Sequence, residues 1–308
     1  MQIIHKITQL RESLSPSRKE GLRIGLVPTM GALHDGHLKL IREARKHCDI
    51  VVVSIFVNPT QFGPSEDLDK YPRTLDSDAQ LCENEHVDYV FAPSVAEIYP
   101  DDNYLQIQIN KLADNLCGAS RPGHFNGVLQ VVNKFFQIVQ PDEAFFGQKD
   151  IQQFVLIQTM VDEFNIPVIL HAIPTVRESD GLALSSRNRY LSSADRDIAS
   201  NFYASLQDIK NKLELLVDEW SQQAEDSNVE FNRAVNRYNN TLKQLQVKIK
   251  FHEDKLTEIG FKIDYLEVVD FKTLQPVESP SEVVKFIVAG AVYLGNTRLI
   301  DNIIVENN

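Results

Sequence analysis

Residues 23–56 read RIGLVPTMGALHDGHLKLIREARKHCDIVVVSIF and contain a complete strand–turn–helix–strand pattern. The short apolar run RIGLVPT precedes a stretch in which Leu38, Ile41, Ala44 and Cys48 recur at helical spacing. The following run, DIVVVSIF, is too apolar for a half-exposed strand and is typical of a central strand covered on both faces. This order of elements predicts a βαβ unit in a parallel sheet.

The same alternation continues along the first half of the chain. Further strands are predicted in HVDYVFAP, EAFFGQ and IPVILHAI, and helices in TLDSDAQLCENE and from about Ile151. One more helix shows an apolar face made of Val128, Val131, Val132, Phe135, Phe136 and Val139. We therefore expect an α/β fold with a doubly wound, Rossmann-like parallel sheet, whose ligands bind at the carboxyl ends of the strands.

The pattern changes after Ile173. The segment PTVRESDGLALSSRNRYLSSADR is polar and rich in turn formers, which predicts two domains, residues 1–175 and a smaller α+β domain of residues 176–308. Ser192 and Asp195 have the spacing of a capping box that opens a helix. The charged segment near 220–258 is typical of long surface helices. The last three apolar runs predict short antiparallel strands, with Gly290 and Gly295 near the turns.

Composition limits the class of protein. The 308 residues carry a formal net charge of −12, which argues against a nucleic-acid-binding protein, because such a protein needs a surplus of Lys and Arg. Three cysteines without CxxC spacing favour free thiols in a reducing compartment. No stretch approaches the ~20 apolar residues that cross a bilayer. We expect a cytoplasmic protein with no membrane segment.

The stretch PTMGALHDGHLKL, residues 28–40, is the sharpest chemical signal. It places glycines and two histidines between a strand and the first turn of a helix, where free N–H groups and the helix dipole favour phosphate. His34 and His37 can then donate hydrogen bonds to a polyphosphate. The alternatives are a His-x-x-His metal pair, which lacks neighbouring ligands, or two ordinary surface histidines. Asp35 is interpreted as the N-cap of the helix.

Several longer motifs accompany this one: SIFVNPTQFGPSEDLDKYPRT, SRPGHFNGVLQVVNKFF, FFGQKDIQQ, TVRESDGLALSSRNRYLS and YLGNTRLIDN. HDGH resembles the H-x-G-H signature of the nucleotidyltransferase superfamily. Together with it, these stretches are similar to the pantothenate synthetase family. The resemblance implies that pantoate attacks the α-phosphorus of Mg-ATP to give pantoyl adenylate and pyrophosphate. The amine of β-alanine then displaces AMP and gives pantothenate.

The resemblance also implies roles for individual residues. The catalytic set is His37, His34 and Lys149, with His37 matching a residue described as a proton donor to the departing group. Pantoate and β-alanine are assigned to Gln61, Gln153, Asn58, Arg121 and His124. The positions that match ATP contacts are Met30, Gly31, Ala32, Leu33, His34, Asp35, Gly36, His37, Gly147, Gln148, Lys149, Asp150, Val176, Leu184, Ser185, Ser186 and Arg187. Mg²⁺ is expected with ATP, its protein ligands are unknown, and family members are generally homodimers.

Elementary chemistry is consistent with these roles. A carboxylate with a pKa near 4 is already ionised at neutral pH, so adenylation needs no general base. Its difficulty is to bring an anion to a polyanion, which requires cations and in-line positioning. Alone, Lys149 or Arg187 would be read as a solvated surface charge. Asp150 and Gln153 also have the spacing of a helix-capping pair.

Three other classes of protein remain open at this point. Another H-x-G-H nucleotidylyltransferase would act on a phosphate ester and would need more cations than Gln61 and Gln153 offer. An aminoacyl-tRNA synthetase would need a basic RNA-binding surface, which the net charge disfavours. The last class is a binding module that kept the fold without the chemistry.

Overall fold

The computed structural model describes residues 1–64, 66, 68–100, 104–224, 231–277 and 283–306, and omits the side chains of 220–224 and 231–241. The chain divides into two compact units. The first contains residues 1–176 and 184–186, and the second contains residues 177–183 and 187–308. In the described residues, no helix is long and apolar enough to cross a membrane.

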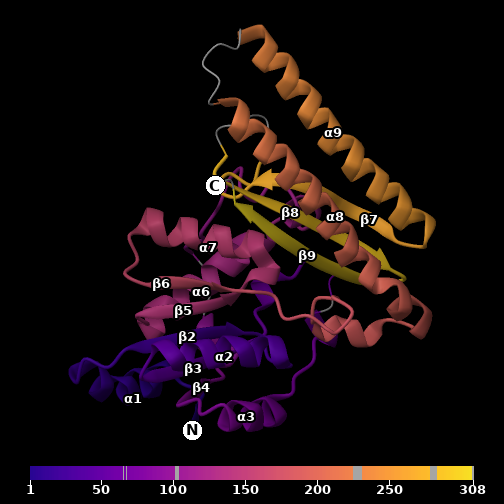
Figure 1. Ribbon diagram of the computed structural model, residues 1–308. Helices are drawn as coiled ribbons and strands as arrows, with labels where there is room; N and C mark the ends of the chain where they lie inside the picture. Colours follow the sequence, from indigo (N-terminus) through magenta and orange to yellow (C-terminus); the bar gives the residue numbers. More distant parts are fainter. Residues whose placement is uncertain (65, 67, 101–103, 225–230, 278–282, 307–308) are drawn as a thin grey trace. The chain divides into compact units, whose positions relative to one another are not determined.

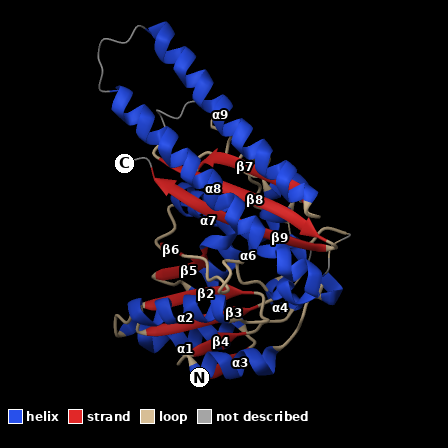
Figure 2. Ribbon diagram, turned by 45° about the vertical axis from the view of Figure 1, so that its right-hand side comes forward, coloured by secondary structure: helices blue, strands red, loops and turns tan. Residues whose placement is uncertain are grey.

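The first unit is built on a six-stranded parallel sheet in the order β1-β4-β3-β2-β5-β6 (Figures 1 and 2). Its strands are β1 (Gln2–Ile4), β2 (Ile24–Thr29), β3 (Ile50–Ile55), β4 (Tyr89–Phe91), β5 (Glu143–Gly147) and β6 (Ile169–Ile173). The five strands predicted in this half of the sequence correspond to β2–β6 and are confirmed, as is the parallel sheet. Strand β1 was not predicted. The buried side chains of Val51, Val52 and Val53 place β3 in the interior, as its composition indicates.

The helices of this unit are α1 (Ile7–Lys19), α2 (Asp35–His47), α3 (Leu75–Asn84), α4 (Val95–Ile98), α5 (Cys117–Ser120), α6 (His124–Val139) and α7 (Ile151–Phe164). Short 3₁₀ turns are η1 (Pro59–Gln61), η2 (Leu68–Lys70) and η3 (Gln148–Asp150). The β2–α2–β3 and β5–α7–β6 crossovers run in opposite directions along the sheet. Because such crossovers are right-handed, α2 and α7 cover opposite faces, which confirms the doubly wound fold.

The strand order reverses between β2 and β5. β2 pairs with β3 along all six residues, but its pairing with β5 is limited to Gly25↔Glu143 and Leu26↔Ala144. The carboxyl halves of β2 and β5 are therefore not joined by the ladder. In open α/β sheets this switch point at the carboxyl edge is where ligands bind.

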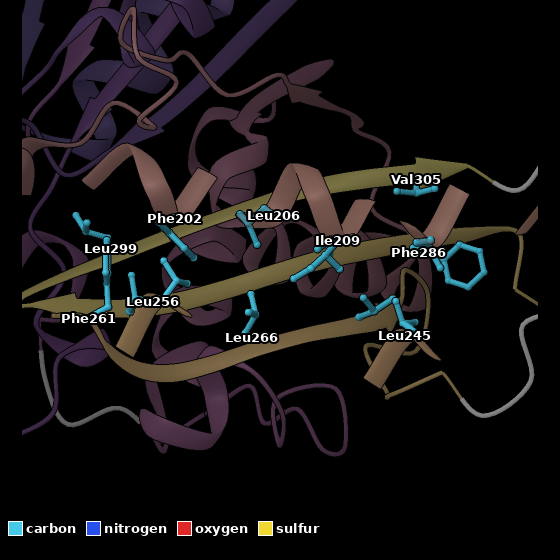
Figure 3. Close-up of a cluster of buried hydrophobic side chains, with 14 of the residues drawn as sticks. Phe202, Leu206, Ile209, Leu245, Leu256, Phe261, Leu266, Phe286, Leu299 and Val305 are labelled. Atoms are coloured by element: carbon cyan, nitrogen blue, oxygen red, sulfur yellow. The ribbon is translucent and has the colours of Figure 1, made fainter. Parts of the chain in front are cut away.

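The second unit contains a three-stranded antiparallel sheet in the order β7-β8-β9. Its strands are β7 (Lys262–Asp270), β8 (Lys285–Leu294) and β9 (Thr297–Glu306), and its helices are α8 (Ser193–Ala224) and α9 (Phe231–Glu258). The 3₁₀ turn η4 (Ser186–Tyr190) begins at the last residue of the first unit and continues into the second. Helices α8 and α9 pack on one another and on the sheet. Figure 3 shows Phe202, Leu206 and Ile209 of α8 meeting Leu245, Leu256 and the strand side chains in one apolar cluster.

The strands, helices and one helix cap of the second unit agree with the sequence, whereas one of its two glycines does not. The three antiparallel strands are confirmed, and the segment predicted as helical near 220–258 is helical up to Ala224 and from Phe231, while residues 225–230 lie outside the described residues. The Ser192 hydroxyl accepts from the Asp195 N–H (3.1 Å) as a cap. Gly295 lies in the turn between β8 and β9, with φ 54°. The prediction for Gly290 is wrong. It lies inside β8, opposite Leu266 and Asp301, and glycine is required there because an added Cβ would meet the ring of Phe202.

Gly290→Ala is expected to destabilise the second unit by about 1–3 kcal/mol, the usual cost of overpacking a core. The added Cβ would lie 2.7 Å from Cε2 of Phe202, whose side chain is fully buried. Urea unfolding measures the change. Phe202→Leu removes the ring edge, so the double variant should lose less stability than the sum of the two single variants. Strict additivity would show that the ring does not set the requirement for glycine.

Candidate active site

Most of the predicted ATP and substrate residues of the first unit follow the carboxyl ends of four adjacent strands, whereas Arg121 lies just before α6 and His124 begins it. Met30 to His37 follow β2, Asn58 and Gln61 follow β3, Gln148 to Gln153 follow β5, and Val176 follows β6. Since β3, β2, β5 and β6 are neighbours, the sheet brings these loops to one edge. The loops after β2 and β5 flank the switch point itself.

The two histidines cap the helix on which they lie. His34, not Asp35, is the N-cap of α2, so the prediction for Asp35 is wrong. The Gly36 N–H donates to His34 Nδ1 (3.1 Å), and the His34 N–H donates to His37 Nδ1 (3.3 Å). Both Nδ1 atoms are acceptors, so neutral rings carry their proton on Nε2. Each ring therefore offers an N–H donor from Nε2.

Burial keeps both rings uncharged. It lowers the pKa of His37 to about 3, with further contributions from His34 and Lys149. Burial and the charge of Lys149 also lower the pKa of His34, which Asp35 and Asp150 partly oppose. Lys149 thus acts electrostatically on both rings, and the predicted catalytic residues His34, His37 and Lys149 are close enough to interact.

The loop between β2 and α2 is held by Asp78 of α3. This carboxylate is 1% exposed and accepts from the Ala32 N–H (2.9 Å), the Leu33 N–H (2.8 Å) and the Thr74 hydroxyl (3.1 Å). The loop needs such an anchor, since Ala32 has φ 51° in the left-handed region. Asp78 was not predicted, and an acidic residue within a helix gives no sequence signal for this task.

A second group of predicted residues forms one hydrogen-bonded network around η1. Asn58 Nδ2 donates to Gln61 Oε1 (3.2 Å) and to the Gly127 carbonyl (3.0 Å), and Tyr99 donates to Asn58 Oδ1 (2.9 Å). Gln61 Nε2 contacts Met30 Sδ (3.0 Å). The network therefore joins the loop after β3 to the loop after β2.

Arg121 and His124 complete this network from the start of α6. His124 Nδ1 donates to the Gln61 carbonyl (2.7 Å), and Arg121 Nη1 donates to His124 Nε2 (3.0 Å). Burial and the charge of Arg121 lower the pKa of His124 to about 4. Arg121 also pairs with Glu66 through two nitrogens (2.7 and 2.5 Å). The charge of Asp150 raises the pKa of His124 and that of His34, as a small contribution against the larger effect of burial.

The other predicted site residues lie at the start of α7 and in the segment of residues 176–187. Asp150 is the N-cap of α7 but makes no side-chain capping bond, so the capping interpretation of Asp150 and Gln153 is wrong. The Val176 carbonyl accepts from the Leu184 N–H (2.9 Å), which brings residues 184–186 into the first unit. Arg187 belongs to the second unit. The ligand contacts of all the predicted site residues, these included, stay predictions.

A buried amide provides an anchor that was also not predicted. Gln152 is 4% exposed and donates to the carbonyls of Leu112 (3.0 Å) and Asn115 (2.9 Å), while its Oε1 accepts from the Gly118 N–H (3.3 Å). It fixes the segment that leads to Arg121. Its neighbour Gln153 was the residue that the sequence singled out.

The family model described as pantoate-beta-alanine ligase matches residues 2–304. The chain belongs to this family. The pantothenate synthetase of Caldicellulosiruptor saccharolyticus is 44% identical over 306 residues, 99% of this chain and 100% of the relative. That of Thermotoga petrophila is 46% identical over 305 residues, 99% of this chain and 100% of the relative. The predicted resemblance and the predicted class of enzyme, a ligase, are confirmed.

Solved structures of the pantoate-beta-alanine ligase family have the same fold. A pantothenate synthetase from Thermus thermophilus superposes with a TM-score of 0.80 at 38% identity and covers 98% of this chain and 99% of its own. The ligase from Francisella tularensis, described as complexed with β,γ-ATP and β-alanine, gives a TM-score of 0.73 at 36% identity, with 98% and 97% covered. The family match thus extends over both units.

Proposed function

We propose that this chain condenses pantoate with β-alanine at the expense of ATP, through a pantoyl-adenylate intermediate, with release of pyrophosphate and AMP. The observation that carries the proposal is the pair of neutral imidazoles at the start of α2, beside the switch point and electrostatically coupled to Lys149. The family match and the Francisella ligase, described as a complex with β,γ-ATP and β-alanine, support the same substrates.

The first step requires that the pantoate carboxylate reach the α-phosphorus of ATP. Both reactants are anionic, so the protein must offset their repulsion and hold them in line. In this proposal the Nε2–H groups of His34 and His37 donate to phosphate oxygens, and Lys149 supplies the positive charge. The N-terminal end of α2 adds its free N–H groups and its dipole. Because the imidazoles are neutral, they contribute donors without burying further cations.

A pKa of about 3 limits what His37 can do. At neutral pH the ring in the free protein carries only its Nε2 proton. Its proposed role is a fixed hydrogen-bond donor to the developing charge, and the proton-donor role that the resemblance implies stays a prediction. Positioned donors of this kind act most strongly where water is excluded.

Pantoate is proposed to bind at the network around Gln61. Its amide nitrogen and oxygen are oriented by Met30 and Asn58, and the Gln61 backbone is fixed by His124. An uncharged amide holds hydroxyls and a carboxylate without forming a tight ion pair, so the carboxylate stays nucleophilic. Gln153 and Asn58 are proposed as further contacts, and Arg121 and His124 are placed on the acceptor side.

The second step needs a free amine. β-Alanine has an amine pKa near 10, so about one molecule in a thousand is nucleophilic at pH 7. The amine attacks the acyl carbon of the adenylate, AMP leaves with the electron pair of the broken C–O bond, and the amine loses a proton to solvent. The site then only has to bind the neutral amine beside the mixed anhydride.

Mg²⁺ is proposed to enter with ATP. Mg²⁺ prefers oxygen ligands and is usually held by phosphates, water and one or two carboxylates. Asp150 fits this requirement, since its side chain is exposed and its charge raises the pKa of His34. Within the described residues, His34 and His37 belong to no group of three metal-ligating side chains, so the His-x-x-His metal pair gains no support.

The cellular setting and assembly are also proposals. We expect a cytoplasmic enzyme, in keeping with its three free cysteines. We expect a homodimer, which sedimentation equilibrium would show as twice the 35.0 kDa chain mass.

Pyrophosphate–ATP exchange tests the proposed function. Purified protein with Mg²⁺ and pantoate, without β-alanine, is expected to return labelled pyrophosphate to ATP, because adenylation is reversible. Exchange must stop when pantoate is omitted. Folded protein that shows no exchange with pantoate or related hydroxy acids would overturn adenylation and leave a binding module.

A further inference from the structure

Three metal-ligating side chains meet at the end of α2 that is remote from His34 and His37. They are His47, the last residue of α2, Glu143, the first residue of β5, and His171 in the middle of β6. Their candidate ligand atoms all lie within 4.8 Å of one another. A helix of this length spans ~20 Å, so the cluster is separate from the proposed ATP site. We propose that His47, Glu143 and His171 bind a Zn²⁺ ion.

The chemistry of the donors favours this ion. Two imidazoles and one carboxylate form a recurrent three-residue set for zinc, with water in the fourth position. Mg²⁺ and Ca²⁺ prefer sites made only of oxygens. His47 is 46% and His171 25% exposed, so solvent can reach the ion and fill the open position.

The distances reach those of a tetrahedral ion when the side chains move by up to ~1.4 Å, since the ligand atoms now lie within 4.8 Å of one another. Ligand atoms at ~2.1 Å from zinc lie ~3.4 Å from one another. His47 Nδ1 is already 3.5 Å from Glu143 Oε2. His171 Nε2 is 2.5 Å from the same oxygen, so these two atoms must separate by ~1 Å. The ion would then replace the hydrogen bond that now joins this pair.

Two of the three ligands, Glu143 and His171, are held in place by other side chains. The Glu143 side chain is 1% exposed, and Arg23 pairs with its Oε1, which leaves Oε2 directed at the two imidazoles. The ring of His171 stacks on Phe145 with centroids 4.6 Å apart and planes at 6°. Metal sites commonly orient their carboxylates and imidazoles through outer partners of this kind. The cluster is therefore organised before an ion binds.

Arg23 is also the main competitor of the ion. Its guanidinium balances the charge of Glu143 when no metal is bound, and the alternative to a metal site is an ion-pair network of these residues alone. Arg23 is 53% exposed and can turn toward solvent without leaving a cavity.

A bound ion would join α2, β5 and β6 at the amino edge of the sheet. Binding should therefore raise the thermal stability of the protein.

Titration of the metal into chelator-treated full-length protein tests the proposal. We expect one Zn²⁺ per chain by calorimetry, and a visible absorption spectrum of tetrahedral type when Co²⁺ is used instead. His47→Gln and His171→Gln should each weaken Zn²⁺ binding by more than the ~10–100-fold that loss of an outer partner costs. Both variants should also lose the rise in melting temperature that Zn²⁺ causes.

Two controls separate this site from other histidines. The double variant His34→Gln/His37→Gln should still bind one Zn²⁺, and so should His86→Gln, which changes an exposed histidine outside the cluster. Circular dichroism verifies that each variant is folded, and exposed His47 can be changed without disturbing the core. The proposal is overturned if wild-type protein binds no Zn²⁺, or if binding survives in folded His47→Gln and His171→Gln.

Discussion

His37→Ala is expected to lower the rate of pantoate-dependent pyrophosphate–ATP exchange by about 10²–10³-fold, the usual effect of removing one fixed donor to a developing negative charge. The Nδ1 atom of His37 accepts from the His34 N–H, so the imidazole can present only its Nε2–H to a phosphate. Alanine supplies no donor, and water that enters the space is not oriented. Initial rates of labelled pyrophosphate incorporation measure the change.

The matched control for this variant is His86→Ala, which removes an exposed imidazole outside the site. It should keep the wild-type rate. A loss of less than tenfold in His37→Ala would contradict the donor role. If Lys149 alone accounted for catalysis, His37→Ala would behave as the control does.

The lowered pKa of His37 also predicts how folding stability and the exchange rate depend on pH. The group is uncharged in the folded protein down to about pH 3, whereas in the unfolded chain it takes up a proton near 6.5. Folding stability should therefore fall as the pH drops below about 6.5, because the unfolded state binds the extra proton. The exchange rate, in contrast, should show no ionisation of His37 between pH 6 and 8.

Asp78→Ala is expected to lower the free energy of unfolding by about 2–5 kcal/mol and to raise the KM for ATP. The half-buried Ala32 and Leu33 N–H groups would lose the carboxylate that accepts from them, and each donor left without an acceptor costs up to ~1–3 kcal/mol. Ala32 would also lose what holds its left-handed backbone. Urea unfolding and exchange rates at varied ATP measure the two effects.

Asp76→Ala is the control for this change. Asp76 lies in the same first turn of α3, is exposed, and should alter stability by less than ~0.5 kcal/mol. If Asp78→Ala lowers stability but leaves the KM for ATP unchanged, the carboxylate supports the core and does not position the ATP loop.

The elements of the fold could be predicted where apolar runs are long. The β-branched run of β3 and the apolar face of α6 each leave one consistent interpretation. β1 could not be predicted in this way, because it has three residues of which only Ile4 is buried. Its pairing with β4 depends on a partner almost ninety residues away. Gly290 was misplaced for a similar reason, since its requirement comes from the ring of Phe202.

The site residues also differ in whether the sequence alone could indicate them. Motifs in the sequence led to the prediction of His34, His37, Gln61 and Lys149 as site residues. The anchors Asp78 and Gln152 bind backbone groups of distant segments, so no local pattern reveals them. The cap of α2 was assigned to Asp35 on the general preference for Asp, whereas the Nδ1 atom of His34 occupies the acceptor position.

The route of the chain between the two units limits how the protein can be dissected. The chain passes from one unit to the other after Val176, after Ala183 and again after Ser186. Arg177 belongs to the second unit, where it pairs with Asp301 and stacks on Tyr203 at 3.7 Å. A gene split at any single point between these residues would leave one product without a segment of its own unit. Dividing this enzyme into two halves that are each whole would require rearranging the order of its sequence.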